Sequence, residues 1–282
     1  MAAQVAGSGR SAARAVPART VTSPAATNTG AINTAAPLLR MSMGFAGRPA
    51  VPACHHDRMT VTVTAARALQ GERADDWQRV ADATKGFLPA DEGSALRAAA
   101  LSTGLSTGSG TWLEIGTYCG KSTVHLGSAA REVGAHLVTV DHHRGSEENQ
   151  PGWEWHDAAL VDQHTGRLET LPSLRHALWD AGLDQTVTVV VGSTQQVAGW
   201  WRTPVDLLFL DGNHTEGAAM HDYAAFAPHV VAGGLLAVHD VFPDPADGGQ
   251  APWHVVQLAL GDGFAQESVT GSLRLLRKES TR

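Results

Sequence analysis

Short hydrophobic runs alternate with helix-like segments over the C-terminal part of the chain. Several of these runs are nearly continuous in Val, Leu and Ile, which is typical of strands covered on both faces. The runs expected to form strands are 111–116, 136–141, 186–192, 205–211 and 235–240. Apolar residues at helical spacing predict helices near 121–132, 167–182, 194–202 and 216–229. This alternation predicts an α/β fold with a doubly wound, parallel sheet.

The last part of the chain follows a different pattern. Residues 263–270 and 271–278 have the composition of two strands, and they meet at Gly271 without a helical segment between them. Strands joined by so short a turn are antiparallel. We therefore expect seven strands, mostly parallel, with an antiparallel hairpin at the C-terminal end.

The segments before residue 106 divide into two parts. Residues 1–58 are rich in Ala, Ser, Thr, Pro and Gly, a composition that cannot bury enough surface to offset the entropy of ordering. We interpret them as a disordered tail or an over-long start, with Met41, Met43 or Met59 as alternative beginnings and a transit peptide as the other reading. Residues 59–105 are expected to form a helical lead-in, with helices at 66–84 and 90–103.

Composition and charge narrow the function. The formal net charge is −7, and residues 1–56 contain five arginines but no lysine and no acidic residue, so the rest of the chain is more acidic still. Such a surface repels a phosphate backbone, which argues against nucleic acid as a partner. No apolar run approaches the roughly 18 residues of a membrane span. Two cysteines cannot form a disulfide framework, so we expect a soluble protein of the reducing cytoplasm. Whether it forms homo-oligomers stays open.

The stretch LEIGTYCGKST, residues 113–123, resembles a phosphate-binding loop but lacks its spacing. A Walker loop needs four residues between its first glycine and Gly-Lys, whereas Gly116 and Gly120 enclose three. Glu114 would also repel a triphosphate. A dinucleotide fingerprint fails as well, because the loop contains no Gly-x-Gly. The loop therefore holds neither a nucleoside triphosphate nor a dinucleotide in our interpretation.

The pattern Glu-x-Gly-x-x-x-Gly-x-Ser after a first strand resembles motif I of class I S-adenosylmethionine-dependent methyltransferases. LEIGTYCGKSTVHL looks most like the loop of the catechol O-methyltransferase-like, metal-assisted O-methyltransferases, and the resemblance extends over roughly residues 85–280. It implies a Rossmann-like sheet in residues 106–282 and S-adenosyl-L-methionine as cofactor. The cofactor-binding residues that it implies are Glu114, Gly116, Tyr118, Gly120, Ser122, Asp141, Ser193 and Asp211.

Each residue has a physical reason for its implied role. Glycines at 116 and 120 let the backbone approach the methionine part of the cofactor. Glu114 would face its cationic end, and the Ser122 hydroxyl would donate to its carboxylate. Asp141 would accept hydrogen bonds from the ribose hydroxyls, with a helix N-cap as its alternative role. Ser193 follows the third strand, where the family contacts adenine, and it can also cap a helix.

The resemblance also implies a divalent metal, Mg²⁺ or Mn²⁺, bound at the ends of the fourth and fifth strands. Asp211 and Asp240 offer the hard oxygen ligands that Mg²⁺ prefers. The family has an Asp-Asn pair where this chain has His239 and Asp240, and imidazole favours Zn, Mn or Fe over Mg. We therefore expect the metal ligands to be Asp211, His239 and Asp240, with His239 as a ligand, a base or a neighbour of the ligands.

Three histidines are candidates for the catalytic base. The family has a lysine base three residues after the first aspartate, and His214 stands at that position. An imidazole that titrates near neutrality can take the proton of an acceptor hydroxyl. His214 is the first candidate, with His142 and His239 behind it.

The segment 141–158 follows Asp141 directly and combines histidines, acidic residues and two tryptophans, Trp153 and Trp155. We interpret it as a lid for the acceptor, with packing of the tryptophans onto the domain as the alternative. The chain is thus expected to be an S-adenosylmethionine-dependent O-methyltransferase that acts on a small molecule such as a sugar, polyol or phenol. The alternatives are a metal-independent methyltransferase and a domain that binds S-adenosylmethionine without catalysis.

Overall fold

A seven-stranded sheet forms the centre of the computed structural model, which describes residues 76–108 and 110–280. The strands are β1 (Thr111–Ile115), β2 (His136–Asp141), β3 (Val187–Val191), β4 (Val205–Leu210), β5 (Val230–Val238), β6 (Phe264–Thr270) and β7 (Leu273–Lys278). Their order is β3-β2-β1-β4-β5-β7-β6, and β7 pairs antiparallel with both β5 and β6. The other neighbouring pairs are parallel. The predicted fold, with its C-terminal antiparallel hairpin, is confirmed.

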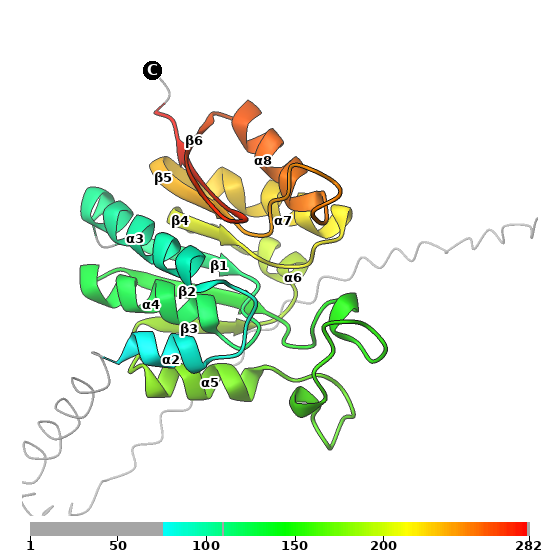
Figure 1. Ribbon diagram of the computed structural model, residues 1–282. Coiled ribbons are helices and arrows are strands. Elements are labelled where there is room, and N and C mark those ends of the chain that lie inside the picture. The colour runs from blue at the N-terminus through cyan, green and yellow to red at the C-terminus, as the bar shows by residue number, and fades with distance from the viewer. Residues whose placement is uncertain (1–75, 109, 281–282) are drawn as a thin grey trace, which may run out of the picture. The chain divides into compact units, whose positions relative to one another are not determined.

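Helices cover both faces of this sheet (Figure 1). The helices are α2 (Trp77–Ala83), α3 (Ala90–Thr107), α4 (Lys121–Val133), α5 (Leu171–Asp180), α6 (Thr194–Ala198), α7 (Glu216–Phe226) and α8 (Ala251–Gly261). One buried core joins strand residues such as Trp112 to α2, α3, α4 and α5. The other joins residues such as Leu113 to α6, α7 and α8. Because consecutive strand residues point to opposite faces, the near-continuous hydrophobic runs supply both cores.

The largest differences from the sequence prediction are at β5 and α8, while α5 begins four residues later and α6 ends four residues earlier than expected. Strand β5 begins at Val230, five residues earlier than expected, and its pairing with β4 shifts register between Val205 and Leu207. The strand passes through Gly233 and Gly234, and Gly233 has a positive φ of 77° within it. Helix α8 was not among the predicted helices. Pro252 lies in the first turn of α8, where a missing N–H costs nothing.

The N-terminal predictions are tested only in part. Helix α3 covers the predicted segment 90–103 and extends it. Of the predicted helix at 66–84, residues 66–75 lie outside the described residues, and α2 covers most of the remainder. The predicted tail, residues 1–58, lies outside the described residues.

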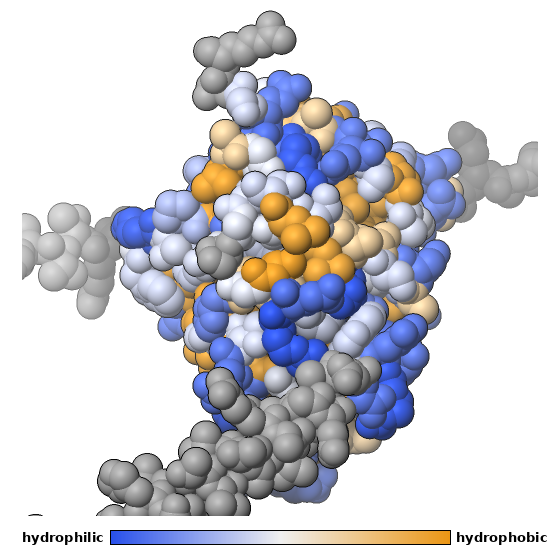
Figure 2. Space-filling model, turned by 90° about the vertical axis from the view of Figure 1, so that its left-hand side faces the viewer, coloured by the Kyte–Doolittle hydropathy of each residue, from blue (hydrophilic) through white to orange (hydrophobic). Residues whose placement is uncertain are grey.

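The face shown in Figure 2 carries a group of hydrophobic residues near its centre, bordered by polar and charged ones. Among the described residues, no helix is both long and apolar enough to cross a lipid bilayer.

Candidate active site

A cavity of about 230 Å³ lies beyond the carboxyl ends of the parallel strands. Each of the five parallel strands contributes a residue within two positions of its end, because the carboxyl ends of parallel strands meet at one edge of the sheet. These lining residues are Gly116, Asp141, Gly192, Asp211 and Asp240. Tyr118, Ser122, His142, Ser193 and His214 line the same cavity. Most of the side chains selected from the sequence are therefore brought together at one place.

Glu114 lies beneath the glycine loop and not in the cavity wall. Its carboxylate is fully buried and accepts hydrogen bonds from the Ser122 hydroxyl (2.6 Å) and the Thr123 hydroxyl (2.7 Å). Burial raises the pKa of Glu114 to about 7. The sequence assigned Glu114 and Ser122 to opposite ends of the methionine moiety, but here they bind each other. Glu114 thus holds the first turn of α4 against β1.

The two loop glycines are required by contacts within the protein. Gly116 has φ +86°, and a Cβ at this position would lie 2.0 Å from the backbone oxygen of Asp211. Gly120 has φ +96°, and its Cβ would lie 2.6 Å from Leu174. A side chain at either position would push the loop away from β4 or α5. This packing is a reason for glycine additional to close approach of a cofactor.

Asp141 fixes the shape of the glycine loop. Its Oδ2 accepts hydrogen bonds from the backbone N–H groups of Thr117 and Tyr118, both at 2.9 Å, and its Oδ1 accepts one from His143 N–H at 2.7 Å. The helix N-cap proposed as an alternative is therefore not its role. Its side chain is 16% exposed and lines the cavity, so lone pairs are left for a ligand. Asp141 joins the ends of β1 and β2 whether or not it also binds ribose.

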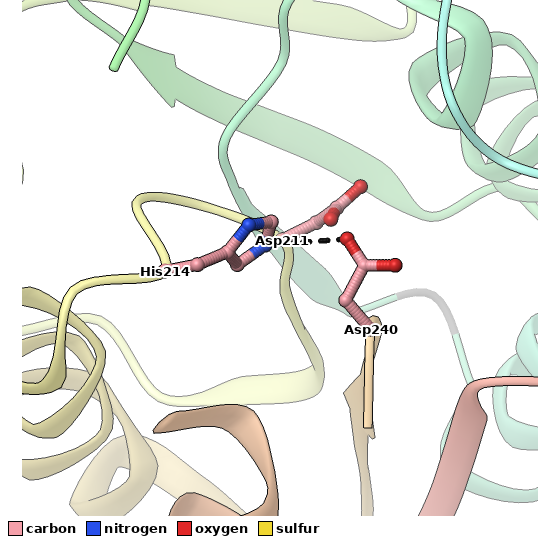
Figure 3. Close-up of side chains that lie close together, drawn as sticks. All are labelled: Asp211, His214 and Asp240. Atoms are coloured by element: carbon pink, nitrogen blue, oxygen red, sulfur yellow. Dashed lines mark ion pairs between the residues drawn. The ribbon is translucent and has the colours of Figure 1, made fainter. Parts of the chain in front are cut away.

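Asp211, His214 and Asp240 form a compact group with metal-ligand character (Figure 3). One ligand atom from each residue can be chosen so that all lie within 4.8 Å of one another. Asp211 and His214 come from the segment after β4, and Asp240 follows β5. His214 Nε2 lies 3.4 Å from Asp240 Oδ2, and His214 Nδ1 lies 3.4 Å from Glu148 Oε1. Burial lowers the pKa of His214, but Glu148, Asp211 and Asp240 outweigh it and raise the pKa overall.

His239, predicted as a metal ligand, lies behind this group. Its side chain is only 1% exposed, and Nδ1 lies 3.0 Å from Asp211 Oδ1. Its other nitrogen, Nε2, lies 2.8 Å from Glu92 Oε2. Burial lowers its pKa, yet these carboxylates and Asp240 raise it to about 12. His239 Nδ1 also lies 3.5 Å from Asp240 Oδ2, so both histidines lie beside the aspartates. They differ in burial, because the His214 side chain is 29% exposed and that of His239 is 1% exposed.

The remaining predicted side chains occupy the cavity rim. His142 is half exposed, and its Nδ1 accepts a hydrogen bond from Arg144 N–H at 3.0 Å. That lone pair is therefore not free for an acceptor proton. Ser193 caps α6 by accepting a hydrogen bond from Gln196 N–H while lining the cavity. Its two predicted positions, at a helix start and at the cavity, are both observed.

The segment between β2 and α5 contacts the helical lead-in through aromatic rings and an ion pair. The ring of Phe87 lies 5.3 Å from the ring of Tyr118 and 5.3 Å from that of Trp155. Lys85 pairs with Asp157 in the same region. Phe87 and Tyr118 line the cavity, so this aromatic row forms one of its walls. Trp155 packs onto the domain and still keeps 46% of its surface exposed.

Three non-glycine residues around the cavity have positive φ angles: Tyr118 (49°), His143 (59°) and Asp240 (53°). L-amino acids adopt this left-handed conformation at a cost, and such residues gather at functional sites. Among the described residues these are the only non-glycine ones with positive φ.

Glu92 is the residue that sequence reasoning missed, since nothing in its helical surroundings signals a contact with His239.

Comparison with known proteins agrees with this geometry. Residues 113–241 match a family model described as a methyltransferase domain. The cofactor-bound protein Rv0187 from MTB shares the fold with a TM-score of 0.50 and 21% identity, over 74% of this chain and 91% of that one. The O-methyltransferase NovP gives a TM-score of 0.51 and 14% identity, over 67% of this chain and 80% of that one. Identities this low show a common fold.

The matched residues run from β1 to the segment after β5, so they include the glycine loop, Asp141, Asp211 and Asp240. The seven-stranded sheet with its antiparallel hairpin agrees with the Rossmann-like fold that the resemblance of the glycine loop implied. The match to a methyltransferase domain over residues 113–241 and the order of the strands show a Rossmann-like methyltransferase fold in this part of the chain.

Proposed function

We propose that this enzyme is an O-methyltransferase that methylates a hydroxyl of a small molecule, a sugar, polyol or phenol, with the help of a divalent metal. The observation that carries the proposal is the position of Asp211, His214 and Asp240 in the same cavity wall as the glycine loop. A methyl donor held by the loop would thus lie beside a group suited to bind the acceptor oxygen.

The residues present fit a divalent ion. Two carboxylates and one imidazole form a mixed donor set that suits Mn²⁺ or a related ion with retained waters. His214 presents Nε2 toward the aspartates while Nδ1 faces Glu148, and a carboxylate at the second nitrogen is typical of metal-binding histidines. His239, which does not line this cavity, donates a hydrogen bond from Nδ1–H to the Asp211 carboxylate. A divalent ion held here would lower the pKa of the acceptor hydroxyl.

Two uses of His214 Nε2 exclude each other. As a ligand, this atom gives its lone pair to the ion. As a base, it takes the acceptor proton, with Glu148 accepting a hydrogen bond from Nδ1–H and holding the ring in place. Both uses need an unprotonated Nε2, so the raised pKa of His214 does not separate them. The geometry favours the ligand role, because Asp211, His214 and Asp240 each offer an atom within 4.8 Å of the others and Glu148 faces the second nitrogen of His214. We therefore assign His214 to the ligands, and a base role for it becomes the alternative.

The remaining contribution of the protein is to hold the acceptor in position for methyl transfer. The acceptor hydroxyl loses its proton to water, its oxygen attacks the methyl carbon, the carbon–sulfur bond breaks, and S-adenosylhomocysteine leaves as a neutral thioether. This displacement needs oxygen, carbon and sulfur in line, so much of the acceleration comes from holding the acceptor in one orientation. Phe87 and Tyr118 offer a flat apolar wall for it. Ser146, Glu148 and Asn149 line the cavity with hydrogen-bonding groups.

The test combines binding and turnover. Calorimetry with S-adenosylhomocysteine measures cofactor binding, and methyl transfer to phenols, sugars and polyols is measured with EDTA, Mg²⁺ or Mn²⁺. We expect cofactor binding without metal, and transfer only with metal. Asp240→Asn should lose Mn²⁺ binding and keep cofactor binding. Asp244→Asn is the matched control, because this exposed aspartate lies in the same loop.

The possible results separate the alternatives. Undiminished transfer in EDTA contradicts the metal and returns His214 to the role of base. Cofactor binding without transfer to any class of hydroxyl supports a binding domain. No cofactor binding at all would overturn the proposal entirely.

A further inference from the structure

A chain of three side chains runs from α3 through the end of β5 to the metal-ligand group. Glu92 Oε2 lies 2.8 Å from His239 Nε2, and His239 Nδ1 lies 3.0 Å from Asp211 Oδ1. Glu92 is 3% exposed and His239 is 2% exposed, so water does not compete for either contact. A carboxylate on one side of the imidazole and a carboxylate on the other hold the plane of the ring.

The geometry also fixes which way the hydrogens point. An ionised carboxylate only accepts hydrogen bonds, so the imidazole nitrogen beside each carboxylate is the donor. Nδ1–H therefore donates to Asp211. Glu92, 2.8 Å from Nε2, fixes the ring orientation that directs Nδ1–H at Asp211.

Glu92 is itself held by the turn between β6 and β7. Its Oε1 accepts a hydrogen bond from the Ser272 backbone N–H at 2.7 Å, and both of its oxygens lie within 3.2 Å of the Ser272 hydroxyl. Gly271 passes so close that a Cβ there would lie 2.2 Å from Glu92 Oε1. The turn is thus shaped around the carboxylate. It leaves Glu92 Oε2 facing His239.

We propose that Glu92 is a positioning residue, which orients His239 so that His239 holds the Asp211 carboxylate in place within the Asp211–His214–Asp240 group. The inference rests on the proposed metal role of that group. Partners behind a metal ligand orient it, and their loss costs about 10–100-fold in metal affinity. Glu92 would therefore affect the metal through its ion pair with His239 and the hydrogen bond from His239 to Asp211, from a helix that precedes the methyltransferase motifs in the sequence.

The experiment measures Mn²⁺ affinity by calorimetry on the full chain, in a cycle of variants. Glu92→Met removes the carboxylate, and we expect Mn²⁺ binding to weaken by about 10–100-fold. His239→Asn should weaken binding similarly, and adding Glu92→Met to it should cause no further loss, since Glu92 acts through His239. Glu92→Gln should restore most of the affinity, because its amide can still accept from Ser272 and donate to His239.

Ser272→Ala is the control for a role confined to the turn. It removes the hydroxyl contact with Glu92 but leaves the contact between Glu92 and His239, so we expect lower thermal stability with unchanged Mn²⁺ affinity. Binding of S-adenosylhomocysteine confirms that each variant is folded. If Glu92→Met fails this check, Glu92→Ser replaces it, because its short side chain lets water hydrate the turn.

Each outcome decides between the claims. Full Mn²⁺ affinity in a folded Glu92→Met or Glu92→Ser variant overturns the positioning role and leaves the metal site standing. Additive losses in the double variant overturn action through His239. A wild-type chain that binds no Mn²⁺ overturns both the metal site and this inference.

Discussion

Asp141→Asn tests whether Asp141 builds the glycine loop or serves only a ligand. The carboxylate accepts three backbone N–H groups, two at Oδ2 and one at Oδ1. An asparagine can place its oxygen where Oδ2 stands and keep two of these bonds. Its NH₂ group then faces the N–H of His143, a donor against a donor. One bond is lost, and the other two lose the strength that the negative charge gives them.

The size of the effect follows from these contacts. A hydrogen bond to a charged group contributes about 1.5–3 kcal/mol, and a buried donor left without a partner has a penalty in the same range. The Asp141 side chain is mostly buried, so water replaces the lost bond only in part. We expect the free energy of unfolding to fall by about 2 kcal/mol without any cofactor. For a domain of this size the melting temperature should then fall by about 4–8 °C.

The assay is thermal and urea unfolding of the cofactor-free protein, followed by circular dichroism, with calorimetric binding of S-adenosylhomocysteine measured alongside. Asp162→Asn is the matched control, because Asp162 also accepts backbone N–H groups but lies in an exposed turn. It should change stability little. Unchanged stability of the cofactor-free Asp141→Asn protein, with weaker cofactor binding, would show that the carboxylate serves the ligand alone.

Three further changes test the same region. Burial raises the pKa of Glu114 to about 7, so the folded state keeps a proton that the unfolded state loses near its ordinary pKa of 4.5. The free energy of unfolding should therefore fall by up to about 3 kcal/mol as pH rises between these two values. Urea titrations over this pH range measure the effect, and Glu114→Gln should make the free energy of unfolding less dependent on pH. Gly116→Ala should destabilise the fold by about 1–3 kcal/mol and abolish cofactor binding in calorimetry, because φ is +86° and the Cβ meets the backbone at the end of β4; wild-type binding would contradict this reasoning. Trp155→Ala removes the ring that packs against Phe87 and should speed amide hydrogen exchange in the segment between β2 and α5. Trp153→Ala removes a more exposed ring and should leave the exchange rates unchanged. Equal rates in the two variants would show that the contact between Trp155 and Phe87 does not stabilise this segment.

The strands and most helices could be predicted from the sequence because their signals are local. A buried parallel strand needs an unbroken hydrophobic run, and β1 to β4 lie within one or two residues of their predicted bounds. The errors at β5 and α8 have one physical cause. Glycine and proline signal turns on average, but here Gly233 lies within a strand and Pro252 within the first turn of a helix.

The position of the site could also be predicted, whereas the partners of its side chains could not. The rule that ligands bind at the strand ends selected Asp141, Asp211, His214 and Asp240, and all four line the cavity. The hydrogen bonds of Asp141 to the loop backbone and of Glu114 to two hydroxyls depend on rotamers. Rotamers are set by tertiary packing and leave no pattern in the sequence. The same holds for Glu92, which is brought to His239 only when α3 packs on the sheet.

At the three non-glycine residues with positive φ near the cavity, thermal stability and the proposed function favour different amino acids. Tyr118, His143 and Asp240 each hold a conformation that glycine adopts freely and that costs other residues about 1 kcal/mol. A selection for thermal stability alone would accept glycine at these positions. At Asp240 that gain would remove a carboxylate from the metal-ligand group, and at Tyr118 it would remove an aromatic wall. For protein engineering, these are positions where a more stable variant is expected to be a poorer enzyme.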